Sequence, residues 1–269
     1  LELGGKDPAL VLSDATLERT TAGILWGAFH NAGQDCSSIE RVYIPFDQKE
    51  LYLAEFKKQL ELLDTSNFAP MMNRDGFMKA KRHIKDAIAN NAKVLCGNEF
   101  DESCFFVKPT ILYDVENHLI IMQEESFAPI LPIHFYKSED EVIQLINQNQ
   151  YGLSASIWTD NIELGKAFAK KIEAGMVTIN NHSVSAANPA LPWVGRKNSG
   201  SGITNSFFTL AAEFINNTSR SVFLTGKAGT GKTTFLKYIC ENTPKNFVVA
   251  APTGVAAINA GGMTLHSLF

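Results

Sequence analysis

The sequence is poor in cysteine, and its four cysteines form neither a CxxC pair nor a dense framework. That pattern is typical of a reducing compartment, so we expect a cytoplasmic protein and not a disulfide-stabilised secreted one. No apolar run approaches the roughly 20 residues that a membrane-spanning helix needs, and no signal segment opens the sequence. We therefore expect no membrane partner. The sequence also contains no GxGxxG, so it offers no dinucleotide-binding fingerprint of that type.

Charge is present but unevenly distributed along the 269 residues. The sequence carries 24 Lys and Arg against 28 Asp and Glu, a formal net charge of −4, which excludes a general polyanion binder. Residues 203–269 hold five basic and two acidic side chains, a net +3, which leaves −7 for residues 1–202. The glycine-rich stretch 195–202 is typical of a loop. We therefore predict two domains, residues 1–202 and residues 203–269.

Hydrophobic periodicity in residues 1–202 alternates between the helical and the strand pattern. Helices are predicted at 47–63, 73–91 and 138–150, and short strands at 93–96, 153–158 and 176–179. Asp47 is a plausible N-cap, and Ser138 with Glu141 forms a capping box. This βαβ rhythm predicts an α/β fold with a largely parallel sheet.

Residues 203–269 show the same alternation of helix and strand patterns over a shorter stretch of sequence. A helix is predicted near 205–217, a strand at 221–225, a helix through about Cys240 and a strand at 246–251.

Cys36 follows a helical run and the glycine-containing turn 31–35. A thiol becomes a useful thiolate where partial exposure and backbone N–H groups favour its charged form. The turn supplies such N–H groups, so Cys36 is a candidate nucleophile. The alternative is a small buried apolar side chain, and spacing alone leaves both interpretations open.

Seven segments, in the same order, resemble the aldehyde dehydrogenase superfamily. They are residues 1–6 (LELGGK), 33–36 (GQDC), 108–112 (KPTIL), 123–129 (QEESFAP), 151–154 (YGLS), 175–180 (GMVTIN) and 192–200 (PWVGRKNSG). The resemblance covers essentially residues 1–202 and implies an aldehyde-dehydrogenase-like catalytic domain.

The resemblance implies NAD or NADP as cofactor and a small aldehyde as substrate. Cys36 would attack the aldehyde to give a thiohemiacetal, and Glu2 would activate the water that hydrolyses the resulting thioester. Glu125 would hold the hydroxyls of the nicotinamide ribose, and Phe127 would lie near the nicotinamide. Without the motif, Glu2 alone would be interpreted as a solvated acid and Phe127 alone as a core side chain.

Two departures from the family pattern bear on activity. Ala128 stands where the family usually has glycine, from which we expect a tighter turn after Phe127. We also expect this sequence to lack the family's amino-terminal half, which carries most of the dinucleotide domain and the oxyanion-hole asparagine. Losing one oxyanion donor costs about 10²–10³ in rate, so we expect the chain to be inactive alone. The resemblance further implies a homo-oligomer, since members of this family are generally dimers or tetramers.

Residues 226–233 (GKAGTGKT) match G-x-x-x-x-G-K-[ST] between a predicted strand and a predicted helix. Backbone N–H groups around Gly226, Gly229 and Gly231 would surround phosphates. Lys232 would neutralise charge and Thr233 would bind Mg²⁺, at a helix N-terminus that favours anions. The pattern predicts ATP and Mg²⁺ binding by a truncated P-loop NTPase segment, with a flexible turn as the alternative.

Together with residues 251–257 and 261–267, the P-loop resembles the start of a superfamily-one DNA helicase of the Pif type. The resemblance implies single-stranded DNA as a partner, approached by Thr253 and His266. For His266, an ordinary partly buried histidine is the alternative. No Asp or Glu follows Glu241, so the second acidic motif is absent and we expect no ATP hydrolysis or unwinding by the chain alone.

Three interpretations follow from these resemblances. The first is a fragment of an NAD(P)-dependent aldehyde dehydrogenase that oxidises an aldehyde to a carboxylic acid. The alternative is an ATP-dependent DNA helicase fragment. The third combines them, as parts of two genes joined near residue 203 by fusion or by a sequence-assembly error.

Overall fold

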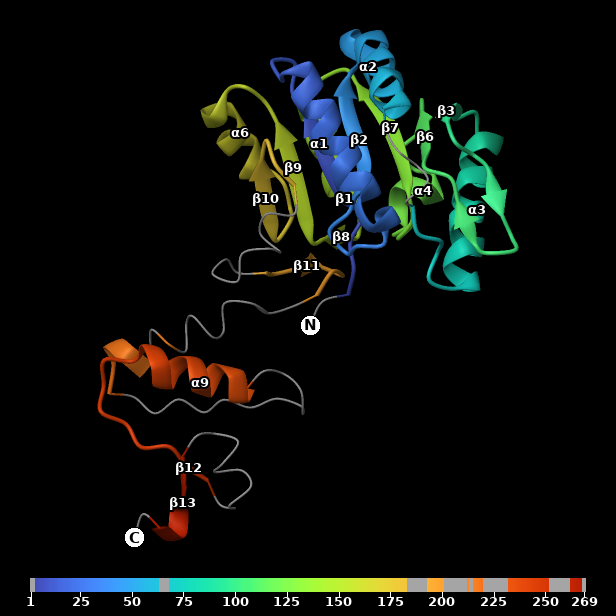
Figure 1. Cartoon of the computed structure of the whole chain (residues 1–269). Helices are drawn as coiled ribbons and strands as arrows, with labels where there is room; N and C mark the ends of the chain where they lie inside the picture. Colours follow the sequence, from blue (N-terminus) through green and yellow to red (C-terminus); the bar gives the residue numbers. More distant parts are fainter. Residues whose placement is uncertain are drawn as a thin grey trace. The chain divides into compact units, whose positions relative to one another are not determined.

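The computed structural model describes residues 3–62, 68–182, 193–200, 212, 215–219, 232–251 and 262–267 (Figure 1). The chain divides into two compact units, Leu1–Thr204 (unit 1) and Asn205–Phe269 (unit 2). Among the residues described, no helix is both long and apolar enough to cross a membrane.

Unit 1 is built on a seven-stranded sheet with the order β10-β9-β1-β2-β7-β6-β3. Its strands are β1 (Asp7–Val11), β2 (Ile39–Pro45), β3 (Lys93–Cys96), β6 (Thr110–Tyr113), β7 (Ile130–Tyr136), β9 (Ser154–Trp158) and β10 (Met176–Ile179). All neighbouring strands are parallel except β3 and β6, which are antiparallel. The predicted α/β fold with a largely parallel sheet is confirmed.

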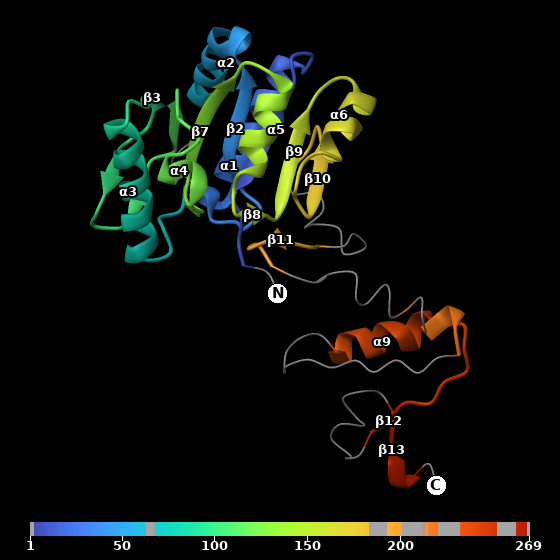
Figure 2. The same ribbon diagram turned by 180° about the vertical axis from the view of Figure 1, so that it is seen from behind.

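Helices cover both faces of this sheet, as a parallel sheet requires. Helices α1 (Leu17–Phe29) and α2 (Lys49–Glu61) pack on one face, in front of the strands in Figure 1. The opposite face is covered by α3 (Arg74–Ala89), α4 (Ile120–Gln123), α5 (Glu139–Asn147) and α6 (Ile162–Ala169), and Figure 2 shows α5 in front. Strand β1 illustrates the division, because Ala9 and Val11 pack in the apolar cluster on the α1 and α2 face, whereas Leu10 packs in the cluster on the opposite face.

Short elements complete unit 1. They are the 3-10 helices η1 (His30–Gly33) and η2 (Phe46–Gln48), the antiparallel pair β4 (Phe100–Asp101) and β5 (Phe106–Val107), and the antiparallel pair β8 (Tyr151–Gly152) and β11 (Arg196–Lys197).

The predicted capping box is present, since the Ser138 side chain and the Glu141 side chain each accept the other residue's backbone N–H. Asp47 is not an N-cap. It lies inside η2, and α2 begins after Gln48 with no side-chain cap. The extra 3-10 turn moves the helix start two residues beyond Asp47, so its carboxylate is not placed to accept the first N–H groups of the helix.

Unit 2 is described in part. It contains α9 (Lys232–Asn242), the parallel pair β12 (Ala250–Ala251) and β13 (Met263–Thr264), and the 3-10 turn η4 (Leu265–Ser267). Its apolar cluster joins Ala212, Phe235 and Ile239. The strand predicted at 246–251 is confined to its last two residues. The strand predicted at 221–225 lies outside the described residues.

Candidate active site

Three segments of the candidate site converge because each precedes one of three adjacent parallel strands. Residues 3–6 lead into β1, residues 33–38 lead into β2, and residues 124–129 lead into β7. These strands are neighbours in the sheet, in the order β1-β2-β7. The amino ends of adjacent parallel strands lie at one edge, so residues such as Gly5 and Glu125, 120 positions apart in sequence, meet there.

The turn that carries Cys36 has an unusual backbone. After α1, three consecutive residues occupy the left-handed region, Asn31 (φ 51°), Ala32 (φ 54°) and Gly33 (φ 66°). A Cβ at Gly33 would overlap the backbone carbonyl of Ala128. Glycine is therefore required where this turn packs against the segment before β7. The Cys36 side chain that follows is half-buried.

Gly5 connects the Cys36 turn to Glu125. Its backbone N–H donates to Glu125 Oε1 at 3.2 Å, and the position of an added Cβ lies 3.1 Å from the Cys36 carbonyl oxygen. Gly4 has φ 81°, and a Cβ there would overlap the Glu125 carboxylate. The two glycines therefore let the Glu125 side chain and the Cys36 backbone approach the start of β1.

Glu125 lines a cavity of about 420 Å³ together with Ser126, Phe127, Gln34 and residues of the 71–79 segment. Gln34 connects the two sides, since its side chain donates to Pro70 O and accepts from the Met72 N–H. Burial, with a smaller effect of the Glu40 charge, raises the pKa of Glu125. Cys36 is not among the residues that line this cavity.

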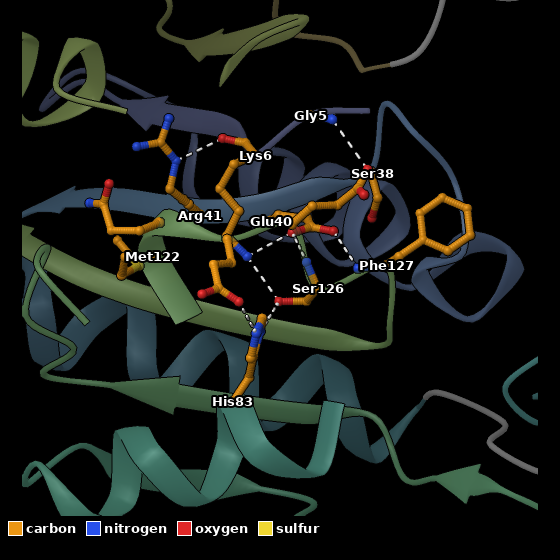
Figure 3. A network of polar contacts seen from close by, with 12 residues as sticks. Gly5, Lys6, Ser38, Glu40, Arg41, His83, Met122, Ser126 and Phe127 are labelled. Atoms are coloured by element: carbon orange, nitrogen blue, oxygen red, sulfur yellow. Dashed lines mark hydrogen bonds and ion pairs between the residues drawn. The ribbon is translucent and has the colours of Figure 1, made fainter. Parts of the chain in front are cut away.

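A buried ion pair lies beneath this cavity. Lys6 and Glu40 are 1% and 2% exposed, and Lys6 Nζ donates to Glu40 Oε2 at 2.6 Å. The same carboxylate accepts the backbone N–H of Ser126 on Oε2 and that of Phe127 on Oε1, each at 2.7 Å (Figure 3). Burial lowers the pKa of the Lys6 ammonium, and the Glu40 carboxylate opposes that shift.

The network continues through His83 on α3. Lys6 Nζ donates to Ser126 Oγ at 2.9 Å, and His83 Nδ1 lies 3.0 Å from the same hydroxyl (Figure 3). Burial, helped by the Lys6 charge, lowers the pKa of His83 to about 4, so the ring is neutral at pH 7. In the arrangement that satisfies all three groups, the Ser126 hydroxyl donates to Nδ1 and Nε2–H points to Glu124, 3.4 Å away.

His182 lies against the other side of the Cys36 turn. It is 4% exposed, and the position of a Cβ on Gly27 would fall 2.7 Å from its ring. Burial lowers the pKa of His182 to about 4, although a hydrogen bond to the Ser37 backbone and the Asp35 charge oppose that shift. His182 therefore packs as a neutral ring.

The predicted dehydrogenase residues fall into two groups. Cys36, Glu125 and Phe127 are brought to the same edge of the sheet, whereas Glu2 lies outside the described residues. The left-handed residue is Phe127 (φ 52°), and Ala128 lies outside that region, so an alanine fits there without backbone strain.

In unit 2, the predicted site residues are described only in part. Gly226, Gly229, Gly231 and Thr253 lie outside the described residues. Lys232 and Thr233 form the first turn of α9, and their side chains are not described. His266 is exposed in η4, so the partly buried alternative is wrong. In the described ranges, no group of three or more His, Cys, Asp or Glu could hold a metal ion.

Sequence reasoning missed the network residues as part of the site, namely Lys6, Glu40, His83, Ser126 and Arg41, whose Nε donates to Lys6 O at 2.7 Å (Figure 3). One signal was present, since Glu40 and Arg41 interrupt a strand that is otherwise apolar, Ile39–Pro45, with every residue buried. Adjacent opposite charges in a central strand need buried partners, which here are supplied by residues distant in sequence.

Two family models match the chain. Residues 1–219 match the aldehyde dehydrogenase family, and residues 204–269 match the PIF1-like helicase family, so the two matches overlap at 204–219.

Curated relatives match about three quarters of the chain. The 4,4'-diapolycopene aldehyde oxidase of Methylomonas sp is 37% identical over 207 residues, which are 75% of this chain and 39% of the relative. The succinate semialdehyde dehydrogenase of Acinetobacter baylyi is 30% identical over 210 residues, 75% of this chain and 43% of the relative. The chain thus spans about two fifths of the length of these relatives.

Solved structures give the same coverage. The NADP-dependent glyceraldehyde-3-phosphate dehydrogenase from Bacillus halodurans, complexed with NADP, has a TM-score of 0.71 and 36% identity. The NAD⁺ complex of the aldehyde dehydrogenase from Bacillus cereus has a TM-score of 0.71 and 34% identity. In each case the match covers 76% of this chain and 43% of the solved chain.

Proposed function

The chain belongs to the aldehyde dehydrogenase family, and on that premise we propose that unit 1 carries the catalytic cysteine and the nicotinamide-side contacts of an NAD(P)-dependent enzyme. This enzyme oxidises an aldehyde to a carboxylic acid. The observation that supports the proposal is the convergence at Gly5, whose N–H donates to Glu125 and where an added Cβ would lie 3.1 Å from the Cys36 carbonyl oxygen.

The residues at this edge fit the nicotinamide-ribose half of a dinucleotide. Glu125 is a half-buried carboxylate on a cavity, and a carboxylate accepts hydrogen bonds from a pair of hydroxyls. Phe127 borders the same cavity and offers an aromatic face to a flat ring. NAD⁺ or NADP⁺, when bound, supplies the hydride acceptor for the oxidation.

The chemistry that we assign to this chain begins at Cys36. Its thiolate sulfur attacks the aldehyde carbon, forming a C–S bond and a thiohemiacetal. After oxidation, the thioester carbonyl is attacked by water, whose proton is taken by Glu2, and the C–S bond breaks to release the carboxylic acid and regenerate the thiolate. Glu125 and Phe127 bind and orient the cofactor.

Alkylation of the four cysteines tests this proposal without requiring turnover, which we expect to be lost in the isolated chain. Cys36 is expected to react with iodoacetamide at least about tenfold faster than the other three, because the backbone N–H groups of its turn would favour the thiolate, which is the form that reacts. Cys96 is the matched control, because it is also half-buried and burial raises its pKa. Rates are read by peptide mass spectrometry under native conditions, and Cys36→Ser identifies the peptide. Equal alkylation rates at Cys36 and Cys96 would contradict the assignment of Cys36 as the nucleophile.

For unit 2 we propose a second function, binding of ATP and Mg²⁺ by residues 226–233 as in the start of a DNA helicase. Two observations support it, the PIF1-like helicase match and the position of Lys232 at the first residue of α9. A P-loop lysine sits where the loop becomes a helix. We also propose single-stranded DNA as the partner of this unit, and a join between two genes near residue 203, which sequencing of the source DNA across codons 190–215 tests.

The nucleotide proposal is tested with a fluorescent ATP analogue. Lys232→Ala is expected to weaken binding at least about tenfold, because it removes a charge-assisted contact to phosphate. Lys237→Ala is the control, since Lys237 is exposed in the same helix. Absence of binding by the unsubstituted chain, or equal affinities for the two variants, would contradict the proposal.

A further inference from the structure

Each carboxylate oxygen of Glu40 accepts a hydrogen bond from one of two consecutive backbone amides. Oε1 accepts the Phe127 N–H and Oε2 accepts the Ser126 N–H, each at 2.7 Å, while Lys6 Nζ lies 2.6 Å from Oε2. Figure 3 shows the carboxylate between the ammonium and the two N–H groups. Three donors therefore meet on one buried carboxylate.

The backbone that Glu40 holds is one that a phenylalanine rarely adopts. Phe127 has φ 52°, a left-handed conformation that costs about 1–2 kcal/mol for an L-residue with a Cβ. Such a conformation persists only where surrounding contacts impose it. The two hydrogen bonds to one buried carboxylate hold the peptide groups on either side of Ser126, and so fix the backbone that leads directly into the left-handed Phe127.

The segment that Glu40 holds carries the two side chains assigned to the cofactor. Glu125 precedes Ser126 directly, and both Glu125 and Phe127 line the cavity of about 420 Å³. Glu40 is 2% exposed and is not among the residues that line this cavity. It therefore acts on this surface through the backbone.

We propose that Glu40, with its charge balanced by Lys6, is a positioning residue that fixes the backbone of residues 125–127 so that Glu125 and Phe127 face the nicotinamide ribose. The ligand in this statement rests on the proposed function, whereas the fixed backbone does not. The competing interpretation is that the ion pair serves only stability. Buried pairs are often replaceable by apolar residues without loss of stability, so a stabilising role alone gives a weak reason for burying these charges.

Hydrogen exchange of individual amides separates the two interpretations. Glu40→Ala is expected to accelerate exchange at Ser126 and Phe127 at least about tenfold, because each N–H loses a hydrogen bond to a charged acceptor. Glu40→Gln keeps one acceptor oxygen and is expected to rescue part of this protection. It also serves as the folded variant if the alanine variant fails to fold.

Asp7→Asn is the matched control. Asp7 is also 2% exposed, and it accepts the Ser154 N–H at 3.1 Å and the Ser154 hydroxyl at 2.6 Å. The Asp7→Asn variant is expected to have a lower melting temperature, while amide exchange at Ser126 and Phe127 stays unchanged. Equal acceleration across unit 1 in Glu40→Gln and Asp7→Asn would overturn the positioning role, as would unchanged exchange in Glu40→Gln.

Titration with nicotinamide mononucleotide adds a readout that a purely structural role would not move. The Kd for nicotinamide mononucleotide is expected to rise severalfold in Glu40→Gln and at least about tenfold in Glu40→Ala. The Asp7→Asn variant is expected to bind this probe with the same Kd as the unsubstituted chain. An unchanged Kd in both Glu40 variants would overturn the proposal. If the unsubstituted chain does not bind this probe, the cofactor assignment fails, while the exchange result still decides whether Glu40 fixes the backbone.

Discussion

Replacing Lys6 with methionine is expected to lower the free energy of unfolding of unit 1 by about 3–5 kcal/mol, the usual cost of removing one partner of a buried ion pair. Methionine keeps much of the length and apolar volume of the lysine stem but removes the ammonium. Glu40 then stays buried with two backbone donors and no counter-charge. The Ser126 hydroxyl also loses its Lys6 donor.

Urea unfolding measures this effect, and Lys108→Met is the matched control. Lys108 pairs with Glu99 at the same 2.6 Å, but the two side chains are 40% and 69% exposed. Exposed pairs contribute about 0–1 kcal/mol, so the control should unfold close to the unsubstituted chain. The double variant Lys6→Met with Glu40→Gln is expected to recover part of the loss, since it removes the unpaired charge. Equal destabilisation by the Lys6 and Lys108 variants would mean that the Lys6–Glu40 pair is not buried as described.

Replacing Gly33 with alanine is expected to have the second-largest effect, a loss of at least about 2 kcal/mol in unfolding free energy. Two costs add. The backbone has φ 66°, where a Cβ is strained, and that Cβ would overlap the Ala128 carbonyl, which is main chain that a rotamer change cannot move. The Cys36 turn and the Phe127 segment must then separate.

The measurement combines urea unfolding with the alkylation rate of Cys36, which should fall towards that of Cys96. Gly76→Ala is the control, because a Cβ there lies an ordinary 3.4 Å from the nearest atom, in the first turn of α3. Alanine is favoured over glycine in helices by up to about 1 kcal/mol, so this variant should be as stable as the unsubstituted chain or more so. A Gly33 variant as stable and as reactive as the Gly76 variant would show that the two segments do not pack together.

Local signals predicted much of the fold. The helix expected at 73–91 occupies Arg74–Ala89, and its N-cap Asn73 accepts the Gly76 N–H. The strand expected at 176–179 has those bounds. These elements depend on periodicity and capping within one stretch of chain, which the sequence displays directly.

Long-range pairing was less predictable. Strand β3 occupies its expected residues but runs antiparallel to β6, a direction set by the partner strand and not by its own residues. Cys36, Glu125 and Phe127 were identified through the family resemblance, and their convergence follows from the strand order. Glu40 was missed because a glutamate beside an arginine is usually solvated, and its donors lie 34 to 87 residues away in the sequence.

Protection of Cys36 from iodoacetamide by nicotinamide mononucleotide is the most direct test that the nucleophile and the nicotinamide-side contacts form one site. Quantitative peptide mass spectrometry would follow Cys36, Cys96, Cys104 and Cys240 together, with adenosine monophosphate as the control ligand that lacks nicotinamide. We predict that Cys36 reacts first and that nicotinamide mononucleotide slows it while adenosine monophosphate does not. Alkylation of Cys36 at the rate of Cys96, or equal rates with either nucleotide, would contradict an assembled dehydrogenase site in this chain.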